Sequence, residues 1–179
     1  MGLKTLLPLV SLIALSLICA GEAQEPASPV AEALRSHVLR AGRNLLAAAE
    51  QMPAEKYGFK PTPAQMSFGD VIAHVAAGSD ALCSSIAGGP TPKRTSVGAG
   101  DSKERLVGRL RETFGFCDSA LAKVDDSRLG EKVPYFSAGE ISRADAMFAT
   151  AEELAGHYSQ LAVYFRLNGL VPPTAKGQK

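Results

Sequence analysis

The sequence carries almost no net charge. Its 19 lysine and arginine residues nearly balance 18 aspartate and glutamate residues, which leaves a formal charge of +1 at pH 7. The basic residues are scattered and form no basic helix face. Proteins that bind nucleic acid through its phosphates concentrate positive charge on one surface. We therefore expect no nucleic-acid partner.

Several catalytic motifs are also missing. Gly98 and Gly100 are not followed by the Lys-Ser/Thr pair of a phosphate-binding loop, nor preceded by an expected strand. The sequence contains no serine nucleophile elbow and no Cys-x-x-Cys pair. These absences argue against the common nucleotide-binding, serine-hydrolase and dithiol-redox arrangements.

Long apolar runs are absent except near the N-terminus. Leu6 to Ala20 is almost wholly apolar, yet it is too short to span a bilayer comfortably. Lys4 is the only charged residue before residues 21–23, Gly-Glu-Ala, which offer small side chains where a signal peptidase cuts. This pattern predicts a secretory signal peptide over residues 1–23, followed by a short mature tail over residues 24–29.

Two other interpretations of the N-terminus remain to be weighed. An uncleaved membrane anchor is the main alternative, which the short apolar core disfavours. A lipoprotein signal fails on local chemistry, because Cys19 follows Leu17 and Ile18 where the lipoprotein box needs a small residue. We expect an exported protein, periplasmic or secreted, with no stable membrane span after signal cleavage.

Cysteine is scarce, with three residues in the chain. Cys19 leaves with the signal peptide, so Cys83 and Cys117 remain. An even number of cysteines in an exported protein favours a disulfide. Both residues lie on apolar helix faces, where a thiolate would be costly, so neither is expected to act as a nucleophile.

Apolar residues at helical spacing dominate the remainder of the chain. They predict helices at about 28–51, 67–87, 101–124 and 142–168. Ser28 and Ser67 are the expected N-caps of the first two. Asn168-Gly169 forms a C-cap for the last, and Pro172-Pro173 prevents its continuation.

The segments between these helices carry turn-forming residues and no second domain. Residues 129–139 are expected to be irregular, with a short extended piece at residues 132–133. No internal repeat appears. We expect one all-α domain over residues 30–173, folded as a four-helix bundle, and a flexible C-terminal tail over residues 174–179.

The cysteine positions bear on helix direction. Cys83 lies about fifteen residues into the second helix, and Cys117 about sixteen into the third. Antiparallel helices joined by a tight turn would separate their heights by roughly 15 Å, beyond the roughly 7 Å limit between bridged Cα atoms. The connection over residues 90–100 can stretch about 36 Å, enough to return along a helix of about 30 Å. A disulfide therefore goes with parallel second and third helices, in an up-down-down-up bundle.

Two stretches resemble a known family. One runs from His157 through Gln160 and an aromatic-rich step to Gly169 and the paired prolines. The other runs from Met52 through Pro63 into a helix start at Ser67–Ala76. Together they resemble the closing motif and the first inter-helix loop of the DinB-like (damage-inducible) family. The resemblance implies an up-down-down-up four-helix bundle. Members of that family divide into metal-dependent thiol transferases and proteins without an assigned activity.

The resemblance also implies a metal site. The family triad is one histidine on the second helix and two histidines four residues apart on the last. His74 and His157 match the first and last positions, whereas Glu153 stands where the family has the middle histidine. Residues at this spacing share a helix face, so Glu153 and His157 could converge on one divalent ion. Two imidazoles and a carboxylate suit Zn²⁺, Ni²⁺, Mn²⁺ or iron.

The alternative is that both histidines are hydrogen-bonded bundle residues without a metal. The side of the second helix that carries His74 is otherwise small or uncharged, at Ala77, Gly78, Ala81 and Ser85. A solvated face normally carries Lys or Glu, so we expect this helix to be buried on more than one side, with His74 facing protein or a cavity. His37 is expected to be an exposed or boundary residue outside the site.

Two functions are therefore open from the sequence. If the protein is an enzyme, the resemblance implies metal-dependent thiol transfer, or a hydrolase-like reaction, on a small molecule. Export argues against this, because the thiol cosubstrates of the family are cytoplasmic. The alternative is a non-catalytic stress-response or binding bundle with a degenerate metal site.

The N-terminal pattern makes a direct prediction. Protein from the extracytoplasmic fraction should begin near Gln24, because cleavage is expected after Ala23. N-terminal sequencing of that fraction measures it. Soluble cytoplasmic protein with an intact Met1 would contradict the prediction.

Overall fold

The computed structural model describes residues 1–2, 28–136 and 139–176. Apart from its first two residues, the expected signal peptide over residues 1–23 lies outside the described part, as do Cys19 and residues 177–179. Within the described part, no helix combines the length and apolar character needed to cross a membrane.

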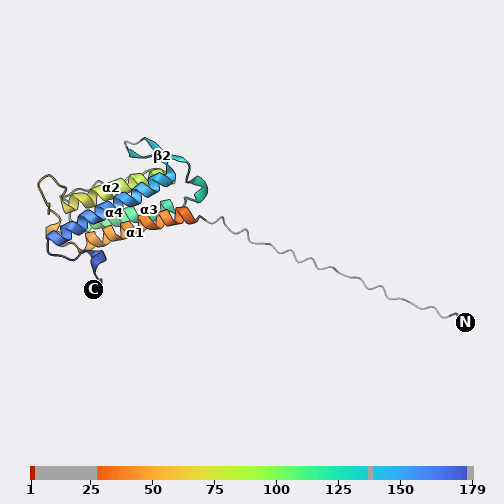
Figure 1. The fold of residues 1–179 in the computed structure, drawn as a ribbon, viewed down its shortest axis with the longest axis horizontal. Coiled ribbons are helices and arrows are strands. Elements are labelled where there is room, and N and C mark those ends of the chain that lie inside the picture. The colour runs from red at the N-terminus through yellow and green to blue at the C-terminus, as the bar shows by residue number, and fades with distance from the viewer. Residues whose placement is uncertain (3–27, 137–138, 177–179) are drawn as a thin grey trace.

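The described residues form a bundle of four α-helices with a small hairpin at one end (Figure 1). The helices are α1 (Pro29–Gln51), α2 (Phe68–Ala87), α3 (Lys103–Leu121) and α4 (Arg143–Leu167). Short 3-10 turns are η1 (Ala54–Lys56), η2 (Asp126–Arg128) and η4 (Pro173–Ala175). The all-α four-helix bundle is confirmed, with helix ends within three residues of the predicted ones.

The hairpin is the element that differs from the sequence prediction. Strands β1 (Lys132–Pro134) and β2 (Glu140–Ser142) pair antiparallel, with Val133 opposite Ile141. Only β1 overlaps the extended piece that the sequence indicates. The sequence does not predict strand β2, because three residues give too little alternation to be recognised. Val133 on β1 is buried, and β1 contacts α2 and α4.

The start of α2 is capped as the sequence predicts, whereas the start of α1 is not. The hydroxyl of Ser67 accepts from the Asp70 amide at 3.1 Å, and the Asp70 carboxylate accepts from the Ser67 amide at 3.0 Å. This capping box begins α2, and its hydrogen bonds lower the pKa of Asp70. Ser28, predicted as the cap of α1, makes no such bond. Its hydroxyl accepts from the Asp126 amide instead, at 3.4 Å.

Contacts along α2 and α3 show that these helices run parallel. The Ala76 carbonyl accepts a hydrogen bond from Thr113 at 3.3 Å, and further along Cys83 is bonded to Cys117. The residue numbers rise together on both helices, as parallel neighbours require. The Cα atoms of the two cysteines are 5.3 Å apart, so the predicted pairing is present in the structure.

The other two pairs of neighbours fix the remaining directions. Arg35 near the start of α1 pairs with Asp118 near the end of α3, so these helices are antiparallel. The Tyr164 hydroxyl near the end of α4 donates to the Met66 carbonyl just before α2, at 2.8 Å. Helices α2 and α4 are therefore antiparallel as well. The bundle is up-down-down-up, as the sequence predicts.

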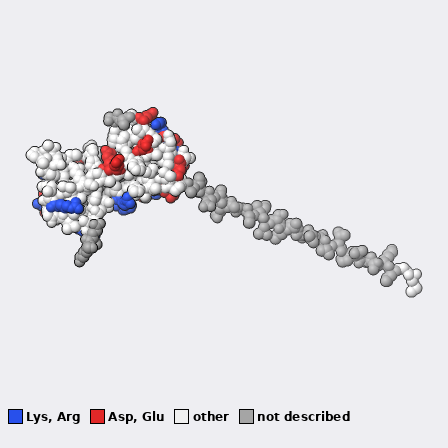
Figure 2. Space-filling model, in the orientation of Figure 1, with Lys and Arg blue, Asp and Glu red and all other residues white. Residues whose placement is uncertain are grey.

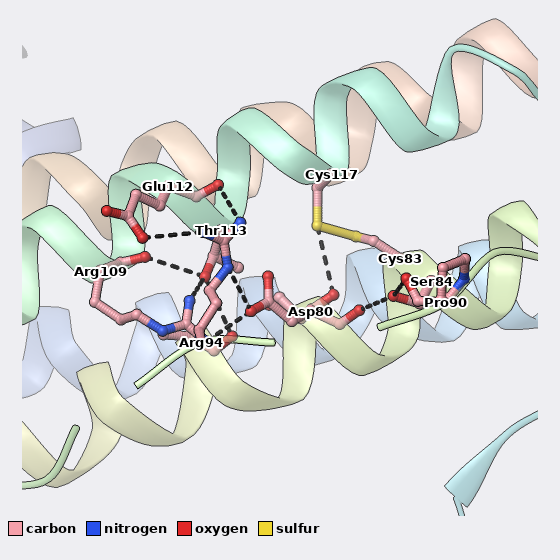
Figure 3. Close-up of polar contacts among 11 residues, drawn as sticks. Asp80, Cys83, Ser84, Pro90, Arg94, Arg109, Glu112, Thr113 and Cys117 are labelled. Carbon is pink, nitrogen blue, oxygen red and sulfur yellow. Dashed lines mark hydrogen bonds and ion pairs between the residues drawn. A yellow bond between two sulfur atoms is a disulfide. The ribbon is translucent and has the colours of Figure 1, made fainter. Parts of the chain in front are cut away.

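A buried carboxylate fastens the long connection between α2 and α3 (Figure 3). The side chain of Asp80 on α2 is 3% exposed. It accepts from Arg94 in the connection at 3.0 Å and from Arg109 on α3 at 2.6 Å. Arg94 also reaches Glu112 at 2.9 Å. Both arginines contact Oδ2 of Asp80, so their charges offset the cost of burying the carboxylate and tie the connection to both helices.

The disulfide supplies the first structural prediction. Replacing both Cys83 and Cys117 with alanine should lower the free energy of unfolding by about 3 kcal/mol, because the bond closes a 34-residue separation in the unfolded chain. Denaturant unfolding of the two proteins measures the difference. Reductant should lower the stability of the wild type and leave the double variant unchanged. Two freely alkylated thiols in unreduced native protein would contradict the bond.

Candidate functional site

The structure brings the three predicted site residues to one pocket. Helix α2 carries His74, and the antiparallel α4 carries Glu153 and His157. All three line a pocket of about 240 Å³ between these helices and the hairpin. Its remaining lining residues are Val75, Gly78, Ser79, Leu82, Phe136 and Leu154.

The two histidines lie against each other in the lining of this pocket. Their ring centroids are 5.0 Å apart, with an angle of 68° between the ring planes. His74 faces a cavity, as expected, but its side chain is exposed, whereas His157 is half-buried. The expected enclosure of His74 is thus incomplete. Helix α2 buries other faces, and this side forms the mouth of the pocket.

Glu153 is exposed and lies on the same pocket wall, one helical turn before His157. Among the described residues, however, no group of three His, Cys, Asp or Glu side chains lies close enough to hold a metal ion. The two imidazoles pack edge to face, and neutral imidazole is a common ligand of divalent ions. The carboxylate, as placed, does not complete a three-ligand set.

A chain of hydrogen bonds sets the orientation of His157. The Tyr164 hydroxyl must donate to the Met66 carbonyl, because a carbonyl oxygen only accepts. The Tyr164 oxygen can therefore accept from the Gln160 amide nitrogen, 3.0 Å away. This arrangement turns the Gln160 carbonyl oxygen toward Nδ1 of His157, at 3.4 Å.

The direction of this chain determines which nitrogen of His157 carries the proton. An amide oxygen can only accept, so Nδ1 of His157 is the donor in this contact. In the neutral imidazole, Nε2 then keeps its lone pair. Metal-binding histidines are oriented in the same way, by a hydrogen bond from the nitrogen that does not bind the metal.

Negative charge gathers near this end of the bundle. Burial, and then the charges of Glu153 and Glu152, raise the pKa of Tyr135 in the hairpin. In the face shown in Figure 2, Asp and Glu side chains cluster over the end that carries β2, whereas Lys and Arg lie mainly elsewhere. The surroundings of the pocket thus favour cations over anions.

A larger hollow of about 650 Å³ lies over α3 and the connection before it. Its arginines are already engaged: Arg94 and Arg109 pair with Asp80, and Arg105 pairs with Asp101 at 3.2 Å. These contacts are structural, and we therefore assign the site to the smaller histidine pocket.

His37 is exposed, as predicted, and lies apart from the other histidines. Two hollows of about 230 and 270 Å³ between α1 and α4 include it in their lining. Its Nδ1 accepts from Arg40 at 2.8 Å. Nothing in this arrangement connects His37 to the pocket between α2 and α4.

Two features of the site could not be found from the sequence. Phe136 follows the extended piece predicted at residues 132–133, but no signal in the sequence indicates the partner strand β2 or places Phe136 beside His74. Gln160 and Tyr164 follow His157 by one and two helical turns, a spacing that could suggest a relay. The direction of the hydrogen bonds, however, depends on the Met66 carbonyl from another element.

Comparison with known proteins supports the fold. The model of the DinB superfamily matches residues 37–161. A search of the curated proteins found no match. Among solved structures, a DinB-like protein from Bacillus subtilis is 16% identical with a TM-score of 0.61, over 76% of this chain and 92% of that one. A conserved protein from Enterococcus faecalis is 17% identical with a TM-score of 0.63, over 79% and 98%.

A third similar structure is a variant of a mycothiol-dependent maleylpyruvate isomerase. It is 16% identical with a TM-score of 0.61, over 73% of this chain and 60% of the isomerase. This chain therefore spans less than two thirds of that enzyme. At such identities the likeness concerns the fold alone.

The hydrogen-bond chain predicts the tautomer of His157. For the neutral imidazole, ¹⁵N NMR should show Nδ1 protonated and Nε2 unprotonated. Replacing Tyr164 with phenylalanine removes the group that orients the Gln160 amide, and should produce a mixture of tautomers.

Tyr158→Phe is the matched control, because Tyr158 lies on the same helix and its hydroxyl contacts Thr174 at 2.8 Å instead. In this variant, His157 should keep the tautomer that it has in the wild type. An Nε2-protonated His157 in the wild-type protein would contradict the relay.

Proposed function

Because the chain belongs to the DinB superfamily, we propose that its histidine pocket binds a divalent metal ion and a small molecule. The observation that carries the proposal is the pair of imidazoles from α2 and α4, whose centroids are 5.0 Å apart in a pocket with apolar walls. Helices α2 and α4 are distant in the sequence, yet each presents a histidine to the same pocket. Packing of the bundle core does not require histidines at these positions.

Each residue has a distinct role in this proposal. His157 offers Nε2, because Nδ1 donates to Gln160. His74 offers a ring nitrogen from the opposite wall, and Glu153 would complete the set with a negative charge. The chemistry of these ligands admits Zn²⁺, Ni²⁺, Mn²⁺ or iron.

The proposed reaction class is thiol transfer to an electrophilic small molecule. A divalent ion in this pocket would supply the positive charge that lowers the pKa of a thiol. Val75, Leu82 and Leu154 would hold the apolar part of the small molecule and limit the access of water. The mycothiol dependence named for the similar isomerase supports a thiol as the second substrate.

A second candidate is a non-catalytic binding bundle. The observation that favours it is that Glu153 does not join the histidines in a three-ligand group among the described residues. The pocket would then bind a small molecule directly, with the imidazoles as hydrogen-bonding groups. We propose that the protein acts after export, where the disulfide is stable. Thiol transfer there requires a thiol outside the cytoplasm, whereas the non-catalytic candidate requires none.

Metal binding decides between the two candidates. Calorimetric titration with Zn²⁺ or Ni²⁺ and elemental analysis of the purified protein measure it. His74→Ala and His157→Ala should each abolish binding, since each removes an imidazole ligand. Glu153→Gln should weaken binding, because the amide has no negative charge. Glu153→His should strengthen it by adding a third imidazole.

His37→Ala is the matched control, since that histidine lies outside the pocket and its loss should leave affinity unchanged. If the wild type purifies without metal from metal-supplemented cells, and Glu153→His gains no affinity, the metal proposal is wrong. The non-catalytic candidate would then be favoured.

A further inference from the structure

Phe136 occupies an unusual position at the mouth of the histidine pocket. It follows β1 at the tip of the hairpin, lines the pocket, and is 58% exposed. We propose that Phe136 is an aromatic specificity wall of this pocket, and that Phe136 and the charge of Glu153 together select small neutral or cationic molecules with a flat apolar body. The inference rests on the pocket being a small-molecule site, as proposed above, but it does not depend on the metal.

The hairpin is anchored so that Phe136 stays beside the pocket. The hydroxyl of Ser85 on α2 donates to the Pro134 carbonyl, and Val133 is 3% exposed. The Tyr135 amide donates to the Gly139 carbonyl at 2.8 Å across the turn. The rings of Tyr135 and Phe136 then pack edge to face, with centroids 5.2 Å apart. Contacts from α2 and within the hairpin thus position the Phe136 ring.

The backbone of Phe136 gives folding no reason to place a phenylalanine there. Its φ is +40°, in the left-handed region that disfavours side chains with a Cβ. Glycine adopts this region freely, as Gly139 does nearby with φ +78°. The exposed ring also gains little from burial. A strained residue at a site points to a role beyond stability, and the pocket that the ring lines is where that role lies.

The lining of the pocket defines the class of ligand. Val75, Leu82 and Leu154 present apolar surfaces, and Phe136 adds an aromatic one. None of the described lining residues is Lys or Arg, and Glu153 contributes a negative charge. A carboxylate ligand would therefore be repelled by the metal-free pocket. Its volume of about 240 Å³ is below the range of about 300–1,000 Å³ for drug-sized ligands, so the ligand is small.

The test uses the full chain without metal and fluorinated probes observed by ¹⁹F NMR. The neutral aromatic probe is 4-fluorobenzyl alcohol, the anionic one is 4-fluorophenylacetate, and trifluoroethanol is the non-aromatic control. The variants are Phe136→Ala and Phe136→Gly. Phe148→Ala is the matched control, because Phe148 is 65% exposed on α4 but lines a different hollow.

We expect 4-fluorobenzyl alcohol to bind more tightly than the other two probes. Both Phe136 variants should lose about tenfold in affinity for it, in line with one lost aromatic contact, and Phe148→Ala should bind like the wild type. The melting temperature of Phe136→Gly should not fall, because glycine relieves the backbone. Unchanged affinity in both Phe136 variants, or equal binding of the anionic probe, would overturn the inference.

Metal titration of Phe136→Ala separates this inference from the metal proposal. The variant should bind metal as the wild type does, because Phe136 offers no ligand atom. If neither protein binds metal but the aromatic probe still distinguishes them, the metal proposal fails and the aromatic wall stands. If both proteins bind metal equally and the aromatic probe does not distinguish them, the metal proposal stands and the aromatic wall fails.

Discussion

The parallel pairing of α2 and α3 is the constraint on which the rest of the structure depends. Neighbouring helices usually reverse direction across a short turn, whereas these run the same way and need a connection along their whole length. Two kinds of bond hold them in this register. The Cys83–Cys117 disulfide joins them covalently, and the buried Asp80 carboxylate gathers Arg94 from the connection and Arg109 from α3.

This pairing determines what faces the histidine pocket. Helix α4 runs antiparallel to α2 and α3 and packs on α2, so its second half meets the first half of α2. His157 therefore lies opposite His74, although the two are far apart in the sequence. The hairpin precedes α4 in the chain and contacts α2 and α4. Phe136 at its tip lines the pocket. The site is thus a product of helix direction and of the residues that each helix carries.

Much of the fold could be predicted because its determinants are local. The spacing of apolar residues predicts the helices, Ser67 and Asp70 predict the start of α2, and the cysteine heights predict helix direction. The structure departs from the sequence prediction where a residue from a distant segment bonds to the same groups. Ser28 makes no cap, and the Asp126 carboxylate accepts from the Val30 and Ala31 amides at the start of α1 instead. The exposure of His74 depends on the space between α2, α4 and the hairpin, which no helix pattern encodes.

The sequence by itself determined the all-α class, the helix ends, the cysteine pair and the identity of the two facing histidines. Each rests on periodicity, on capping or on the resemblance to a family, and these act within one segment or at a known spacing. Only the tertiary structure decided the tautomer of His157, the position of Glu153 apart from a ligand group, and the place of Phe136. These depend on contacts between segments far apart in the chain, where small differences in side-chain direction change the chemistry.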